Sequence, residues 1–181
     1  VIPIGTYYYP LFGHRIKPFA LGPIYIRWIT NHPKDNFKQM TRQQYETLYD
    51  TGLEKFSDNL GDNPAIDAFV ERGGKLMIDH GIDDPLIPVD GTLDYLQKVK
   101  EHFGGWKALD KFLRVYITPG DNHGNCQGNG PGLTESDGMR ALMAWVEDGC
   151  VPEEMRKVRV DRKTGETLEE GMEAPFRLED E

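Results

Sequence analysis

Two residues of this sequence could work together in catalysis, an aspartate and a histidine that each follow an apolar segment. Asp84 lies in a polar loop after residues 75–78, and His123 lies in a glycine-rich loop after residues 113–118. A carboxylate that hydrogen-bonds an imidazole fixes the tautomer of the ring and stabilises its protonated form, so that the ring can act as a general base. The pair therefore predicts base-assisted chemistry. Asp121, close to the histidine, is of a type that favours turns.

The segments around these residues predict the fold. We expect strands at 75–78 and 113–118, and helices over 91–102 and 135–147, with Asp90 as the cap of the first helix. Strands that alternate with helices are typical of a parallel α/β sheet, whose active site lies beyond the carboxyl ends of the strands. An acid after one strand and a histidine after the next is the order found in the second half of an α/β-hydrolase. The predicted class is therefore α/β, the C-terminal half of an α/β-hydrolase fold with helices flanking the sheet, preceded by part of a lid domain.

The loop after the first strand holds competing candidates for the acid. Asp83 is as well placed as Asp84, and spacing alone does not separate them. Pro85 favours an extended residue before it, which suits a carboxylate held at a fixed angle at Asp84. His80 opens the loop and could bind a metal with these aspartates and His123, but the spacing is not that of a regular metal motif. We expect His80 to order the loop through hydrogen bonds, and we expect no metal ligands in this chain.

The serine that should accompany this pair has no counterpart in the chain. Its two serines are Ser57 and Ser136, and neither follows an apolar strand or has glycine neighbours. A nucleophile elbow needs small neighbours because the serine occupies a sharp, strained turn. Ser136 fits a helix start instead. We therefore expect the serine upstream of Val1, on an N-terminal half of the same enzyme that is missing here or forms a separate chain.

Composition divides the chain into three regions. Residues 1–72 form an aromatic, Pro- and Gly-punctuated segment and helices leading into the sheet, residues 73–155 carry both loops, and residues 156–181 form a hairpin and a loosely docked acidic tail. The first region indicates lid or core packing, and a wall of an aromatic-accepting pocket stays open as the alternative. Within it, Thr41 and Gln44 predict a capping box at the start of a helix.

Charge and cysteine content limit the partners. The net charge is −9 and the sequence has no basic run except the short stretch 156–159, so we expect no nucleic-acid partner. No apolar stretch approaches the ~20 residues that span a bilayer, so we expect no membrane partner. Cys126 and Cys150 are too few for a disulfide scaffold and lack metal-ligand spacing. They could pair with each other, pair with another chain or stay free, and a disulfide would favour an oxidising compartment.

Several segments resemble the tannase and feruloyl esterase family. They are the acid loop, the histidine loop with its glycine-rich continuation, the closing helix and the end of the lid: 73–88, 119–123 with 128–132, 141–149 with Pro152, and 18–28. The resemblance implies a secreted serine esterase that cleaves aromatic acid esters, gallate- or ferulate-type, with Asp84 and His123 in the catalytic triad. It implies no cofactor for this chain and admits calcium in a lid portion outside it.

One position departs from the family pattern. The family usually has a cysteine directly after the catalytic histidine, bonded to a cysteine beside the nucleophile. Here Gly124 follows His123 and Cys126 comes two residues later, so the partners of Cys126 and Cys150 stay open. Two other functions stay open as well, an α/β-hydrolase with a different substrate, such as a prolyl-oligopeptidase-type peptidase, and a non-catalytic hydrolase-like subunit. The sequence identifies no substrate-binding residue.

Overall fold

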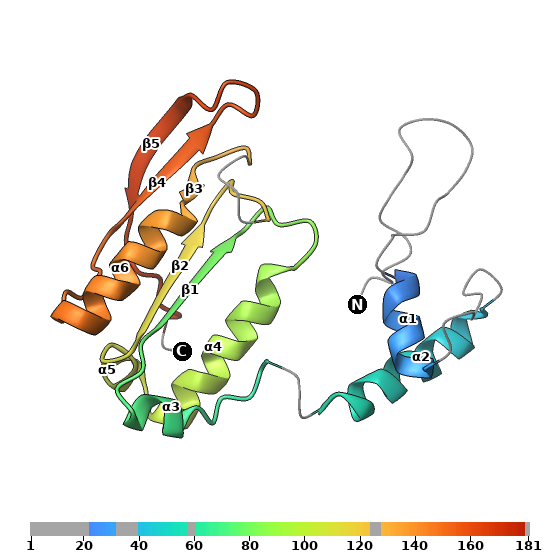
Figure 1. The fold of residues 1–181 in the computed structure, drawn as a ribbon. Helices are drawn as coiled ribbons and strands as arrows, with labels where there is room; N and C mark the ends of the chain where they lie inside the picture. The colour runs from blue at the N-terminus through green and yellow to red at the C-terminus, as the bar shows by residue number, and fades with distance from the viewer. Residues whose placement is uncertain (1–21, 32–39, 58–60, 124–127, 180–181) are drawn as a thin grey trace. The chain divides into compact units, whose positions relative to one another are not determined.

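The computed structural model describes residues 22–31, 40–57, 61–123 and 128–179. The chain divides into two compact units between Gly61 and Asp62, and each unit is described by itself (Figure 1). The short helix α3 (Asp67–Glu71) belongs to the second unit. The division therefore falls earlier than residue 72, where we expected the first region to end.

The first unit contains the helices α1 (Gly22–Thr30) and α2 (Arg42–Lys55). Helix α1 is followed by Asn31 in the left-handed conformation, with φ at 57°. Asparagine tolerates this conformation better than most residues, which explains the helix end. The Lys55 ammonium group donates to the carbonyl oxygens of Trp28 and Ile29 at 3.1 and 3.0 Å, so the end of α2 satisfies carbonyls that α1 leaves free.

The predicted capping box at the start of α2 is confirmed. The Thr41 hydroxyl accepts from the Gln44 backbone N–H at 3.3 Å, and the Gln44 side chain accepts from the Thr41 N–H at 2.8 Å. Most of the aromatic segment that we expected to form a lid or a pocket wall lies outside the described residues. Trp28, at the end of that segment, is exposed.

The second unit is built on the parallel pair β1 (Leu76–Gly81) and β2 (Leu113–Thr118), joined through the helix α4 (Val89–Phe103). A parallel pair needs such a crossover because the chain must return to the starting edge of the sheet. Helix α4 covers one face of the pair and α6 (Glu135–Asp148) covers the other, as Figure 1 shows. This is the predicted α/β class, with strands and helices close to the expected positions.

The side chains of β2 are buried on both faces of the sheet. Val115 packs in a cluster with Leu96 and Val99 of α4, whereas the next residue, Tyr116, packs with Leu133 on the opposite face. Each fully buried aliphatic side chain contributes about 1.5–3 kcal/mol. A slip by one residue would exchange the two faces, so this burial fixes the register of the strand that leads to the histidine loop.

Both long helices of this unit begin close to the expected residues. Thr134 caps α6, and its hydroxyl accepts from the Asp137 N–H at 3.1 Å. The prediction that Asp90 caps α4 is wrong, because Pro88 occupies the N-cap position without a side-chain hydrogen bond. Asp90 lies in the first turn instead, where a carboxylate interacts favourably with the helix dipole.

A second, antiparallel sheet has the strand order β3 (Gly132–Leu133), β4 (Met155–Val160) and β5 (Thr167–Glu173). The pairing of β4 with β5 confirms the predicted hairpin. Ion pairs join the two strands across the hairpin: Arg156 with Glu170, Lys157 with Glu173, and Arg159 with Glu169. Pairs of this kind contribute about 0–1 kcal/mol each at exposed positions, so strand pairing and burial hold the hairpin more than charge does.

The acidic tail is docked, so the expectation of a loose tail is wrong. The Phe176 N–H donates to the Val115 carbonyl of β2 at 2.7 Å, and the indole of Trp106, in the short helix α5 (Trp106–Leu109), donates to the Leu178 carbonyl at 2.9 Å. Phe176 and Leu178 pack against the same hydrophobic cluster as Val115. Apolar side chains that alternate with charged ones hold the tail against the core.

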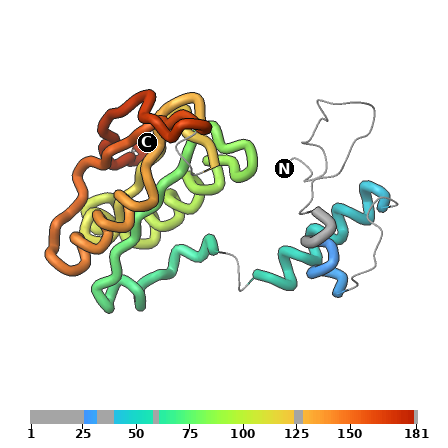
Figure 2. Tube along the Cα trace, turned by 45° about the horizontal axis from the view of Figure 1, so that its top comes forward, coloured from blue at the N-terminus to red at the C-terminus, as the bar shows by residue number. Residues whose placement is uncertain are grey.

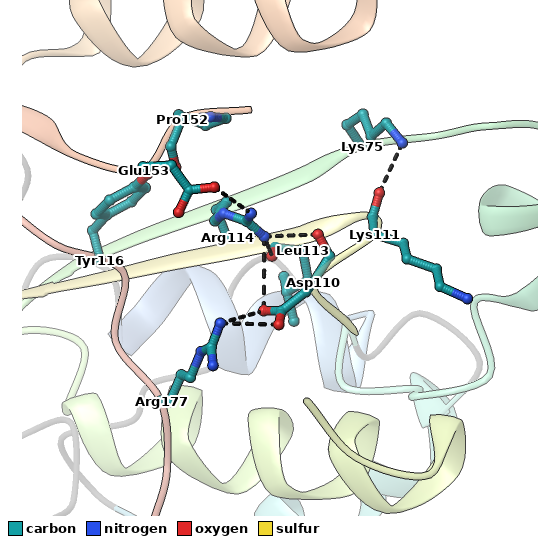
Figure 3. A network of polar contacts seen from close by, with 9 residues as sticks. All are labelled: Lys75, Asp110, Lys111, Leu113, Arg114, Tyr116, Pro152, Glu153 and Arg177. Atoms are coloured by element: carbon teal, nitrogen blue, oxygen red, sulfur yellow. Dashed lines mark hydrogen bonds and ion pairs between the residues drawn. The ribbon is translucent and has the colours of Figure 1, made fainter. Parts of the chain in front are cut away.

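A buried arginine, Arg114, anchors the start of β2 through the network of polar contacts in Figure 3. The side chain of Arg114 is 7% exposed, donates to the Asp110 carbonyl at 2.8 Å and pairs with Glu153 at 3.2 Å. Its guanidinium lies over the Trp145 ring, 5.2 Å from the centroid. Arg177 of the tail bonds both carboxylate oxygens of Asp110 at 2.9 Å. This network joins the strand, helix α6 and the tail.

Candidate active site

The strands β1 and β2 end side by side, and hydrogen bonds join the loops that come after them. The Ile82 N–H donates to the Thr118 carbonyl at 3.1 Å, and the Asp83 N–H donates to the Asp121 carbonyl at 3.0 Å. Figure 1 labels the two strands that lead into these loops, and Figure 2 traces the same chain from another side. The acid and the histidine are thus presented from one joined pair of loops.

Glycines allow the loops to come this close. A Cβ on Gly81 would lie 2.5 Å from the Asp121 carbonyl oxygen and 2.6 Å from that of Asn122. Gly120 has φ at 82°, and a Cβ there would lie 2.7 Å from Gly130 Cα. The Gly130 N–H donates to the Gly120 carbonyl at 2.8 Å. Backbone packs directly on backbone at both positions, which only glycine permits.

The structure brings the two predicted residues together. His123 Nδ1 lies 2.7 Å from Asp84 Oδ2, with the Asp84 side chain 7% exposed and the His123 side chain 51% exposed. A carboxylate can only accept, so Nδ1 carries the proton in this bond. In the neutral ring the other nitrogen, Nε2, then has no proton and can take one up. This is the tautomer that a general base requires.

The second oxygen of Asp84 is held by the backbone. Oδ1 accepts from the Leu86 N–H at 2.7 Å and from the Ile87 N–H at 3.0 Å. Burial by itself raises the pKa of Asp84, but the hydrogen bonds from His123, Ile87 and Leu86 together outweigh it and leave the pKa below its ordinary value. The carboxylate is therefore ionised at neutral pH and fixed in orientation.

The structure separates Asp84 from its neighbour Asp83, which spacing alone did not. Asp83 is exposed, and its carboxylate reaches the Asn129 amide at 3.5 Å, the outer limit of a hydrogen bond. Asp84 instead folds its carboxylate back onto the N–H groups of the residues after Pro85. The sequence signal for this turn was an aspartate before a proline, followed by residues whose backbone N–H groups can donate to the carboxylate.

His80 orders the acid loop, as expected. Its Nε2 lies 2.8 Å from the Ile87 carbonyl oxygen, and its Nδ1 lies 2.8 Å from the Thr92 hydroxyl in the first turns of α4. The sequence analysis did not predict Thr92 as part of the site. Its position at the start of the helix that follows the acid loop could have indicated this contact. Among the described residues, no group of three or more His, Cys, Asp or Glu side chains could hold a metal ion.

Asp121 has a larger role than that of a turn residue. It is 1% exposed, its carbonyl accepts from the Asp83 N–H, and its carboxylate accepts from the Asn122 N–H at 3.0 Å. The carboxylate also lies against Gly132 of β3, where a side chain would displace it. Asp121 thus joins the histidine loop to the acid loop and to the second sheet.

The structure describes only one of the two cysteines. Cys150 is exposed and has no disulfide partner among the described residues, and Cys126 lies outside them. A disulfide between Cys126 and Cys150 stays a prediction. A disulfide from Cys126 to a cysteine beside the nucleophile stays a prediction.

A parallel strand–helix–strand unit that ends in a hydrogen-bonded acid and histidine defines the C-terminal part of an α/β-hydrolase fold. The chain belongs to the tannase and feruloyl esterase family, because the family model described as "Tannase and feruloyl esterase" matches residues 25–172. In the described part of the chain, no helix has the length and apolar character needed to cross a membrane.

Curated relatives and solved structures agree with this assignment. A "Probable feruloyl esterase" of Arthroderma benhamiae is 29% identical over 93% of this chain, and a "Tannase" of Aspergillus oryzae is 32% identical over 65% of it. The chain spans only 33% and 22% of these relatives' lengths. The structure of a tannin acyl hydrolase from Aspergillus niger matches 89% of this chain, and 31% of its own length, with a TM-score of 0.67 at 22% identity. At that identity the likeness shows the fold.

Proposed function

We propose that this chain is the histidine- and acid-bearing part of a carboxylic ester hydrolase that cleaves aromatic acid esters of the gallate or ferulate type. Membership of the tannase and feruloyl esterase family supports the class of substrate. A further relative, a "Mono(2-hydroxyethyl) terephthalate hydrolase" of Piscinibacter sakaiensis, is 36% identical over 88 residues, and its name also describes an aromatic ester. The observation that carries the proposal is the hydrogen bond between His123 and Asp84 at the carboxyl ends of two parallel strands.

The proposed reaction uses both sides of the His123 ring. Asp84 holds the Nδ1–H, and Nε2 removes the proton from a serine hydroxyl as the serine oxygen attacks the ester carbonyl carbon. The protonated ring then gives that proton to the departing alcohol, which leaves an acyl-enzyme. Water repeats the sequence: its proton passes to Nε2, its oxygen attacks the acyl carbon, and the serine leaves with the proton. Asp84 stays ionised and stabilises the charged ring throughout.

The serine would come from a part of the protein upstream of this chain, together with the N–H groups that stabilise the oxyanion. Two features of the described residues support such a partner. The parallel sheet has two strands here, whereas parallel sheets are usually larger and covered on both faces. On α6, three large apolar residues at helical spacing are exposed by 59, 48 and 59%: Met139, Met143 and Val146. We propose that the serine-bearing part covers them.

The test is an activity comparison on the assembled enzyme, this chain together with the serine-bearing part. Methyl gallate and methyl ferulate should be hydrolysed, peptide amides should not, and His123→Ala should remove the ester activity. Turnover of amides but not of esters would favour a peptidase. A folded assembly without any His123-dependent turnover would favour a non-catalytic subunit. Secretion, which the family resemblance implies, would be tested by recovery of the protein from the culture medium of its source.

A further inference from the structure

The imidazole of His80, which the proposed reaction does not use, is bonded at both of its nitrogens. Nε2 lies 2.8 Å from the Ile87 carbonyl oxygen, and Nδ1 lies 2.8 Å from the Thr92 hydroxyl. A carbonyl oxygen only accepts, so Nε2 carries the proton, and in the neutral ring Nδ1 accepts from the hydroxyl. His80 is therefore held as the Nε2–H tautomer. His123 has the opposite arrangement, with its proton on Nδ1 facing Asp84.

Ile87 joins the two histidines into one continuous chain of hydrogen bonds. Its carbonyl accepts from His80, and its N–H donates to Asp84 Oδ1 at 3.0 Å. Asp84 Oδ2 in turn bonds His123 Nδ1 at 2.7 Å. The chain runs from Thr92 in helix α4, through His80 at the end of β1, to the acid and the base.

We propose that His80 is a positioning residue for ester hydrolysis, which acts through Ile87 to hold the Asp84 carboxylate against His123, with Thr92 fixing the His80 ring. This inference rests on the proposed function. Both ring nitrogens of His80 are bonded within the loop and to α4, so its effect would pass through the backbone of the acid loop.

The exposure of the loop explains why such an anchor is needed. Leu86 and Ile87 are 44 and 54% exposed, so little apolar packing holds this stretch of chain. Loops with few buried contacts open at low free-energy cost. His80 lies in a strand and Thr92 in a helix, which are rigid elements. Their hydrogen bonds therefore restrain the position of the acid loop and of Asp84. A displacement of about 1 Å in a reacting group can cost about 100-fold in rate.

Loss of the His80 ring should act on the rate more than on binding. Without its donor the Ile87 carbonyl turns to water, and the Ile87 N–H can leave Asp84. The hydrogen bond from that N–H is one of the interactions that lower the pKa of Asp84. The carboxylate would then stabilise the protonated His123 less well in the transition state, so the loss should fall on kcat rather than on KM.

Four variants and one control separate positioning from packing. His80→Leu removes the donor, whereas the amide nitrogen of His80→Gln can reach the place of Nε2 and restore it. Thr92→Val removes the hydroxyl, and Thr92→Ser keeps it. His102→Gln is the matched control, because His102 lies on the same helix α4 and bonds Asp67 at 2.7 Å, away from the acid loop.

The experiment measures kcat and KM of the assembled enzyme on methyl ferulate and methyl gallate. His80→Leu should lower kcat about 10- to 100-fold with KM changed by less than about threefold, and His80→Gln should recover most of the loss. Thr92→Val should fall between Thr92→Ser and His80→Leu, and His102→Gln should match the unmodified enzyme. Unchanged kcat in His80→Leu, or equal losses in the Leu and Gln variants, would overturn the inference.

Nuclear magnetic resonance of the ring nitrogens gives a readout independent of turnover. The unmodified enzyme should show His80 as the Nε2–H tautomer and a low-field Nδ1–H signal from His123, which should weaken in His80→Leu and persist in His80→Gln. An undiminished signal in both variants would overturn the inference. If no ester is hydrolysed, the proposed function fails while this measurement still tests the contact. Should His80→Leu fail to fold, Thr92→Val and Thr92→Ser replace it: kcat and the His123 signal should fall in the first and persist in the second, and equal values in both would overturn the inference.

Discussion

Gly81 packs its Cα against the Asp121 carbonyl oxygen so closely that an added Cβ would lie 2.5 Å from that atom. The contact sits where the acid loop leaves β1. Just beyond it, the Ile82 N–H bonds Thr118 at the end of β2 and the Asp83 N–H bonds Asp121 in the histidine loop. The distance between Asp84 and His123 therefore depends on how closely the backbones of two loops approach.

We expect Gly81→Ala to separate the loops, because the obstructing atoms are backbone and have little room to shift. Stability should fall by about 1–3 kcal/mol, and ester turnover should fall further because the acid and the base move apart. Thermal unfolding and kcat measure the two effects. Gly138→Ala is the matched control: Gly138 lies within α6 with nothing within 4 Å of an added Cβ. That change should stabilise by about 0.5–1 kcal/mol. Equal behaviour of the two variants would contradict the packing argument.

The ionised state of Asp84 should appear in the pH dependence of stability. Its pKa in the folded protein lies below the ordinary value of 3.8, so its contribution is present above that value and is lost as the pH falls through the lowered pKa. Asp84→Asn should therefore lower Tm at about pH 7, and the difference should shrink toward about pH 3. A difference in Tm that stays constant over this range would show that the charge of Asp84 is not what stabilises the loop.

The C-terminal tail should contribute to the stability of the core. Phe176 packs against the hydrophobic cluster and its N–H bonds Val115, so Phe176→Ala should cost about 1–3 kcal/mol. Arg177→Ala removes a partly exposed ion pair to Asp110 and should cost less than about 1 kcal/mol. Urea unfolding of the two variants measures the order. A larger loss in Arg177→Ala than in Phe176→Ala would contradict the docked arrangement.

Much of the fold and the pairing of acid with histidine could be predicted from the sequence, because both depend on local patterns. The apolar runs before Asp84 and His123 are strong strand signals, and parallel strands place the loops at their carboxyl ends along one edge of the sheet. The role of His80 could also be predicted from its place at the start of the acid loop. The family resemblance was confirmed by the match to residues 25–172.

Other features depend on contacts that spacing does not encode. Asp83 and Asp84 differ only in which carboxylate turns back onto the N–H groups after Pro85, a choice made by the conformation of the loop. The docking of the tail rests on Phe176 and Leu178, two apolar residues within a short acidic segment. Asp121 looked like a turn residue because its burial depends on β3 and on the acid loop, which are distant in sequence.

Two neighbouring substitutions, Asp84→Asn and Asp83→Asn, show whether catalysis depends on the hydrogen bond between Asp84 and His123. Both remove one negative charge from the same loop, but only Asp84 bonds His123. The measurement is kcat on methyl gallate or methyl ferulate with the assembled enzyme. We expect a loss of about 10³-fold or more for Asp84→Asn and a change of less than about threefold for Asp83→Asn. Equal losses, or near-normal turnover by Asp84→Asn, would contradict this expectation.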